Sequence, residues 1–65
     1  MHHVTLYATP DCELCAEVRE FLRSRGVQFA EIDIRQDALA FHQMVVYAGG
    51  PLVPVVDVDG DVMVG

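Results

Sequence analysis

The sequence contains no lysine, and four arginines are its only strongly basic side chains. Because it carries ten aspartates and glutamates, its formal net charge is −6. Such a surface repels nucleic acids and anionic membranes, so we expect partners of neither kind. The sequence also lacks any apolar run near the ~20 residues of a membrane-spanning helix, and nothing after Met1 resembles a signal peptide. These absences predict a cytoplasmic protein.

Cysteine is nearly absent as well. The chain has two cysteines in 65 residues, too few for the disulfide framework of a small secreted protein. Hydrophobic residues make up 52% of the chain, which is typical of a globular rather than a disordered protein. We expect one small domain over residues 1–65, and its stability is limited because a chain this short buries only ~60% of its unfolded surface.

Hydrophobic periodicity divides the chain into β-prone runs and two segments with apolar residues at helical spacing. The expected order is strand, helix, strand, helix, strand, strand, over residues 4–8, 13–25, 27–34, 37–48, 53–58 and 61–64. Asp59-Gly60 fits the tight turn of the last hairpin. A strand–helix–strand unit implies parallel strands, and a hairpin implies antiparallel ones. The order βαβαββ therefore predicts an α/β fold with a mixed four-stranded sheet flanked by helices.

The two cysteines lie in Cys12-Glu13-Leu14-Cys15, where the first strand turns into the first helix. That spacing places both sulfur atoms on one helical turn, close enough for a disulfide. The helix N-terminus favours the thiolate of Cys12, which is nearer to solvent and is the expected nucleophile. Cys15, one turn further on the apolar side, is the expected resolving thiol. A CxxC in this setting is typical of thioredoxin-like redox proteins.

Two other interpretations of the cysteine pair are open. Two buried structural cysteines can share this spacing by coincidence. A CxxC also supplies two ligands of a zinc or iron–sulfur site, but a tetrahedral zinc needs two more. The only histidines are His2, His3 and His42, and we expect His42 to be a partly exposed helix residue. We therefore predict no metal ligands.

Val53-Pro54 interrupts what is otherwise the third strand. Proline has no N–H to donate to a sheet, so it marks either an ordinary edge strand or a special backbone position. A cis Val53-Pro54 bond would turn the Val53 backbone toward a bound peptide or thiol rather than toward the sheet. Together with the CxxC, this favours Val53 and Pro54 as substrate-binding residues.

Tyr7 and Pro10 lie in the segment that leads to Cys12, and we add them to the expected substrate-binding residues. For Tyr7 the alternative is a structural role, which is the commoner one for a tyrosine in a strand. Arg19, on the first helix, is expected to point outward with its charged neighbours.

In order and spacing, these segments resemble the glutaredoxin family. The resemblance rests on Tyr7 to Cys15, the strand ending near Asp33, Leu52-Val53-Pro54-Val55-Val56 and the hairpin with Gly60, and it covers nearly the whole chain. It implies a thioredoxin fold with Cys12 as nucleophile, Cys15 as resolving cysteine and Pro54 as the cis-proline that faces them. It also implies a role in electron transport and cell redox homeostasis.

The chain departs from the glutaredoxin pattern where that family holds glutathione. Glu13-Leu14 replaces Pro-Tyr between the cysteines, and Thr9 replaces a lysine before the loop proline. The run Gly49-Gly50-Pro51-Leu52 offers no basic or amide side chain before the Val-Pro pair. The pattern is similar to bacterial glutaredoxin-like redoxins, some of which are reduced by thioredoxin reductase. We expect either that reductase or glutathione as the electron donor, and no metal or organic cofactor.

The thioredoxin fold normally ends on a helix after the hairpin, and none follows Gly65 in this chain. One face of the sheet would then be half covered, exposing apolar strand residues. We expect the domain to be C-terminally incomplete, the native chain continuing beyond Gly65; the alternative is a second copy that covers the gap.

Taken together, the residues predict a small thiol–disulfide oxidoreductase that reduces disulfide-containing proteins through Cys12 and Cys15. One alternative is a metal-handling or iron–sulfur module built on the CxxC. The other is a regulatory protein that kept the fold without turnover.

Overall fold

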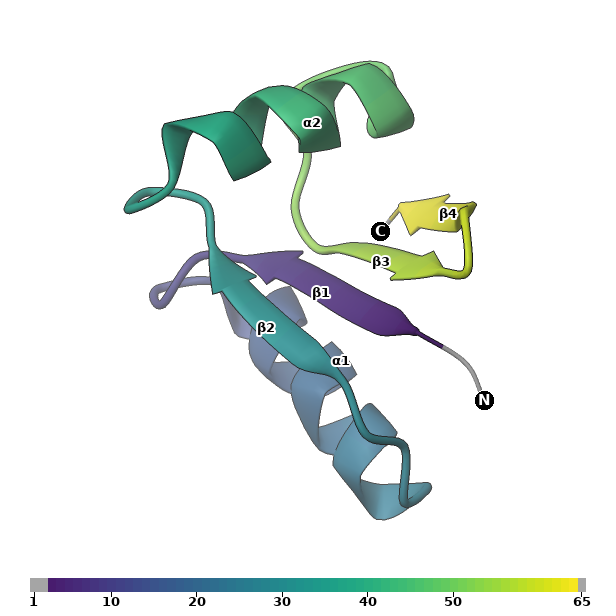
Figure 1. The fold of residues 1–65 in the computed structure, drawn as a ribbon. Coiled ribbons are helices and arrows are strands. Elements are labelled where there is room, and N and C mark those ends of the chain that lie inside the picture. The colour runs from purple at the N-terminus through teal and green to yellow at the C-terminus, as the bar shows by residue number, and fades with distance from the viewer. Residues whose placement is uncertain (1–2, 65) are drawn as a thin grey trace.

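The computed structural model describes residues 3–64 and contains the six expected elements in the expected order (Figure 1). The strands are β1 (Val4–Ala8), β2 (Ala30–Asp33), β3 (Val55–Val58) and β4 (Asp61–Val64), and the helices are α1 (Glu13–Ser24) and α2 (Ala38–Ala48). The predicted βαβαββ order and mixed four-stranded sheet are confirmed.

The sheet has the strand order β2-β1-β3-β4. β1 pairs in parallel with β2 and antiparallel with β3, and β4 joins β3 as the antiparallel hairpin. In this register Leu6 of β1 lies opposite both Glu31 of β2 and Val56 of β3. Helix α1 lies against one face of the sheet and α2 against the other (Figure 1).

β2 begins at Ala30, later than the expected Val27, because Gly26 and Val27 form the C-terminal cap of α1. Gly26 adopts a φ of +69°, a conformation that glycine reaches without steric cost. Its N–H donates to the carbonyl of Arg23 at 3.0 Å, and the Val27 N–H donates to the carbonyl of Leu22 at 3.0 Å. These two bonds form a Schellman motif, so the N–H groups that close the helix are unavailable to a strand.

β3 also begins later than predicted, at Val55 rather than Val53. The Val53-Pro54 peptide bond is cis, and Pro54 has no N–H to offer a neighbouring strand. The strand pairing therefore starts directly after the proline, and Val53 stays outside the sheet.

Two separate cores lie on the two faces of the sheet, because successive residues of β1 point to opposite faces. The α1-side cluster consists of Leu6, Ala8, Cys15 and Val56. The α2-side cluster consists of Tyr7, Ala40, Met44 and Val55.

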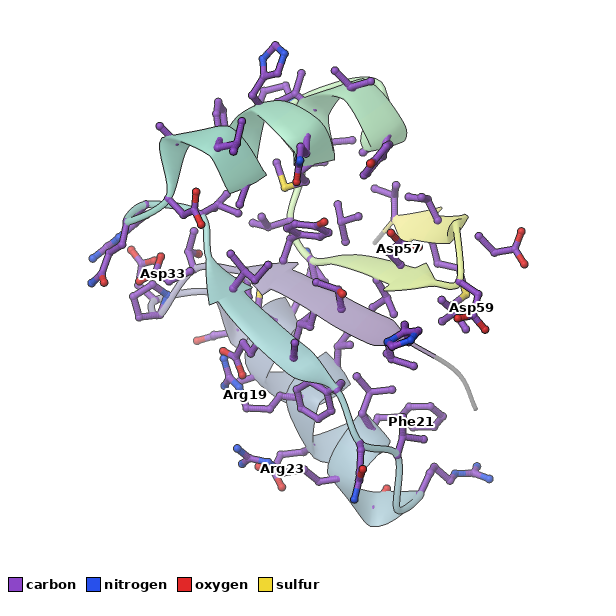
Figure 2. The ribbon with its side chains drawn as sticks, viewed as in Figure 1. Arg19, Phe21, Arg23, Asp33, Asp57 and Asp59 are labelled. Atoms are coloured by element: carbon purple, nitrogen blue, oxygen red, sulfur yellow. The ribbon has the colours of Figure 1, made fainter. Side chains whose placement is uncertain are left out.

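Helix α1 leaves part of its face of the sheet uncovered. An open groove of about 230 Å³ lies beside the helix. It is lined by Val18, Phe21, Leu22, Pro54, Val56, Met63 and Val64. Phe21 is 56% exposed and Met63 is 57% exposed, so large apolar side chains meet solvent at this face (Figure 2).

The fully buried Met44 of α2 offers a test of the α2-side cluster. We expect Met44→Ala to lower the free energy of unfolding by about 3 kcal/mol, because the change removes buried apolar atoms and leaves a cavity. Urea denaturation measures the loss. Val46→Ala, on the same helix but with a side chain 65% exposed, is the control and should cost less than about 1 kcal/mol. Equal losses in the two variants would contradict the observed packing.

Candidate active site at the start of helix α1

Cys12 occupies the N-cap position of α1, directly after the Thr9-Pro10-Asp11 loop. Its backbone is extended, with φ −98° and ψ 115°, and its carbonyl accepts the Ala16 N–H at 3.1 Å. Its Sγ accepts the N–H of Cys15 at 3.0 Å. An oxygen of serine or aspartate usually makes this bond at an N-cap. The sulfur of Cys12 therefore sits at the positive end of the helix dipole, which favours a negative charge there.

The two thiols differ in their access to solvent. Both are free, and Cys12 is partly exposed whereas Cys15 is 0% exposed. Cys15 is buried because it lies one helical turn further on and packs among Leu6, Ala8 and Val56. Leu14, between the cysteines, points outward and is 54% exposed. A disulfide on another protein can thus reach the sulfur of Cys12 but not that of Cys15.

Burial is the largest cause, and the hydrogen bond with Cys12 the next largest, of the rise in the pKa of the Cys15 thiol to about 11. The Thr9 backbone and the positive charge of Arg19 oppose this shift. A thiol with such a pKa keeps its proton at neutral pH, and only the thiolate is a strong nucleophile. The electrostatics therefore favour the order in which Cys12 attacks first.

Val53 and Pro54 occupy different positions relative to the cysteines. Val53 is partly buried and packs against the α1-side cluster, as Cys12 also does. Pro54 is less than 2% exposed and lines the groove beside Val18 and Leu22. The structure thus gathers Cys12, Cys15 and Val53 around one cluster, with Pro54 placed along helix α1.

The structure separates Tyr7 from Pro10. Pro10 is exposed in the turn before Cys12, so it remains at the rim of the site. The side chain of Tyr7 is only 5% exposed and belongs to the α2-side cluster, with Met44 and Val55. Because Tyr7 lies between Leu6 and Ala8 in β1, it points to the opposite face from Cys15. The structure therefore does not bring Tyr7 beside the sulfurs, and its place is structural.

Sequence reasoning missed one pair of side chains near the dithiol. Arg19 was expected to point into solvent, but its side chain is only 22% exposed and binds Glu31 of β2 (Figure 2). The i,i+4 spacing of Arg19 from Cys15 could have indicated that the two residues share a face of α1. The partner of Arg19 on β2 depends on the strand register, which the sequence does not reveal. A second arginine, Arg35, lies 3.9 Å from Asp11 in the loop before Cys12, and both side chains are exposed.

Within residues 3–64, no three side chains of His, Cys, Asp or Glu lie close enough together to hold a metal ion. His42 is exposed on α2, and His2 lies outside the described residues. Neither helix of this part of the chain has the length and apolar character to cross a membrane.

Alkylation should distinguish the two thiols. We expect iodoacetamide at neutral pH to modify Cys12 at least about tenfold faster than Cys15, because Cys15 is buried and keeps its proton. The rates are measured by mass spectrometry on Cys15→Ser, which retains Cys12, and on Cys12→Ser, which retains Cys15. Similar rates in the two folded variants would contradict the observed burial.

The raised pKa of Cys15 also predicts a dependence of stability on pH. The pKa of the Cys15 thiol rises from about 9 in the unfolded chain to about 11 in the folded protein. The stabilisation that follows is complete below pH 9 and is lost as the pH rises toward 11. We expect the free energy of unfolding to fall over this interval by on the order of 2 kcal/mol. Urea denaturation at several pH values measures it. Burial raises the pKa of Tyr7 too, so Cys15→Ala should remove only part of the slope, and an unchanged slope would refute the assignment.

Three comparisons bear on the family and fold of this chain. The family model described as glutaredoxin matches residues 4–63. The chain is 29% identical over 62 residues to a Clostridium pasteurianum protein described as an uncharacterized glutaredoxin-like 8.6 kDa protein in the rubredoxin operon. That match covers 95% of this chain and 83% of the relative.

Solved structures agree with the family model. The thioredoxin-like protein BC3987 has a TM-score of 0.88 at 34% identity, over 95% of this chain and 85% of its own. The glutaredoxin from Archaeoglobus fulgidus has a TM-score of 0.89 at 27% identity, over 100% of this chain and 76% of its own. The thioredoxin fold is therefore confirmed, and with residues 4–63 matched the chain belongs to the glutaredoxin family.

Proposed function

We propose that this chain is a thiol–disulfide oxidoreductase that reduces protein disulfides by dithiol exchange. The observation that carries the proposal is the arrangement of the two free sulfurs. Cys12 is partly exposed, and its Sγ lies 3.0 Å from the backbone nitrogen of Cys15, a residue that is itself fully buried. Membership of the glutaredoxin family supports the same chemistry.

In the first step, the thiolate of Cys12 attacks one sulfur of the substrate disulfide. A bond forms between Cys12 Sγ and that sulfur, the substrate disulfide breaks, and the other sulfur leaves as a thiolate that takes up a proton. The N–H of Cys15 and the N-terminus of α1 stabilise the negative charge of Cys12 before the attack.

In the second step, Cys15 loses its proton and attacks Cys12 Sγ. The Cys12–Cys15 disulfide forms, the mixed disulfide breaks, and the second substrate sulfur leaves as a thiolate that takes up a proton. Two electrons have then passed from the dithiol to the substrate. A thiol or dithiol reductant must return the pair to its reduced form.

We place the substrate segment across Cys12, between the exposed Pro10 and the partly exposed Val53. Exposed Leu14 offers an apolar contact beside the reacting sulfur. Pro54, which follows Val53, is buried along the groove beside α1, and Tyr7 packs in the cluster on the other face of the sheet.

For the electron donor, we favour a protein of the thioredoxin reductase class over glutathione. Asp11 and Glu13 flank Cys12, and both are exposed, so the two carboxylates of glutathione would meet like charges there. Of the two flanking side chains, only Asp11 has an arginine of residues 3–64, Arg35, within 3.9 Å. Two cysteines, too few for the disulfide framework of a small secreted protein, suit a reducing compartment, and we propose the cytoplasm.

Cysteine substitution tests the mechanism. With a disulfide-containing protein substrate, thioredoxin reductase and NADPH, we expect Cys12→Ser to lower NADPH consumption by at least about 100-fold, because the attacking thiolate is lost. Cys15→Ser should accumulate a mixed disulfide on Cys12, detected as an increase in intact mass. Full turnover by Cys12→Ser would overturn the proposal.

Two further measurements separate the alternatives. Replacing the reductase with glutathione and glutathione reductase tests the donor, and faster turnover with glutathione would reverse our preference. Stoichiometric bound metal in elemental analysis would favour a metal module built on the CxxC. A folded wild-type protein without turnover, whose Cys15→Ser variant accumulates no mixed disulfide, would favour a regulatory role.

A further inference from the structure

The ion pair between Arg19 of α1 and Glu31 of β2 is shorter and less exposed than the other arginine ion pairs of residues 3–64. Arg19 Nε donates to Glu31 Oε1 at 2.6 Å and Nη2 donates to Oε2 at 2.5 Å, a bidentate arrangement. The two side chains are only 22% and 33% exposed. By contrast, Arg23 makes a single 3.3 Å contact with Glu20, and those side chains are 61% and 72% exposed.

The pair lies on the same side of the sheet as Cys15. Arg19 follows Cys15 by four residues, so the two share a face of α1 on adjacent turns. Glu31 is in register with Leu6, and partners in register point to the same face of a sheet. Leu6 packs directly in the cluster that buries Cys15. The ion pair therefore closes the edge of the cluster that contains the resolving thiol.

Few groups are available to help Cys15 lose its proton. The strand residues packed against it, Leu6, Ala8 and Val56, are apolar. No polar or charged side chain within residues 3–64 is buried, so no interior carboxylate serves as a base. The groups that act on Cys15 are the Cys12 side chain, the Thr9 backbone and the charge of Arg19.

In the mixed disulfide, Cys12 carries neither a thiol proton nor a negative charge. The Thr9 backbone and Arg19 are then the groups that favour the Cys15 thiolate against burial. Glu31 acts on Arg19 rather than on Cys15. Its hydrogen bond raises the pKa of Arg19, and Arg19 in turn holds the pKa of Glu31 below its usual range. The pair therefore stays ionised while Cys15 titrates.

We propose that Arg19 and Glu31 are positioning residues for the second step of dithiol exchange, with Arg19 promoting the attack of Cys15 and Glu31 restraining it. This inference rests on the proposed function. Arg19 stabilises the developing negative charge on the Cys15 sulfur, which then bonds to Cys12 Sγ as the substrate thiolate departs. Glu31 accepts both hydrogen bonds from the guanidinium and offsets part of its charge.

The test measures the second step alone. A fluorescent thiol is attached to Cys12 as a mixed disulfide, and its release by Cys15 is followed from pH 6 to pH 10. We expect Arg19→Gln to slow release at neutral pH by about three- to tenfold and to move the pH profile toward higher pH. We expect Glu31→Gln to accelerate release and to move the profile toward lower pH. Arg19→Lys, which keeps the charge, should remain close to wild type.

The opposite signs separate this role from a structural one. If the ion pair only stabilised the fold, both neutral variants would change release in the same direction or not at all, which would overturn the inference. Arg23→Gln and Glu20→Gln, at the exposed pair on the same helix, are the matched controls and should move the profile much less than Arg19→Gln does. A shift of the profile in the controls equal to that in Arg19→Gln would also overturn it.

A second readout does not depend on turnover. In Cys12→Ser the only thiol is Cys15, and its ionisation is followed by thiolate absorbance in the ultraviolet. Adding Arg19→Gln should move its midpoint upward and adding Glu31→Gln should move it downward, with urea denaturation confirming that each variant is folded. If wild-type protein fails to release the fluorescent thiol, the proposed function fails. If it releases the thiol but neither midpoint moves, this inference alone fails.

Discussion

The hydrogen bond from the Cys15 N–H to the sulfur of Cys12 connects the fold to its chemistry. It satisfies one of the N–H groups that a helix leaves open at its start, so helix α1 begins where the redox pair is located. The same bond sets the distance and direction between the first sulfur and the residue that bears the second. Removing the sulfur of Cys12 therefore removes both a nucleophile and a helix cap.

Strand β1 extends this connection into the core. Its alternating side chains supply Leu6 and Ala8 to the cluster that buries Cys15, and Tyr7 to the cluster beneath α2. Because the burial of Cys15 controls its protonation, the packing of this small core and the reactivity of the dithiol depend on the same residues. The Arg19–Glu31 ion pair lies at the edge of the same cluster and places a positive and a negative charge there.

Local patterns in the sequence were sufficient for the element order, the CxxC at a helix start and the unusual Val53-Pro54 position. Spacing also indicated which cysteine is buried, because Cys15 continues the apolar stripe of α1. The features that could not be predicted depend on distant residues. Arg19 finds Glu31 only through the register of β2, β2 starts late because Val27 closes a helix, and the face of Tyr7 follows from its neighbours in β1.

The buried proton of Cys15 has a consequence for the electrochemistry of the pair. Since the reduced protein keeps that proton up to about pH 11, closing the Cys12–Cys15 disulfide releases at least one proton at any physiological pH. Each released proton shifts the equilibrium constant tenfold per pH unit, which is about 30 mV for a two-electron couple. The dithiol is thus a stronger electron donor in an alkaline environment than in an acidic one. Its reduction potential follows the pH around it, and its equilibrium with a partner couple follows the pH only as far as the two couples differ in the number of protons exchanged.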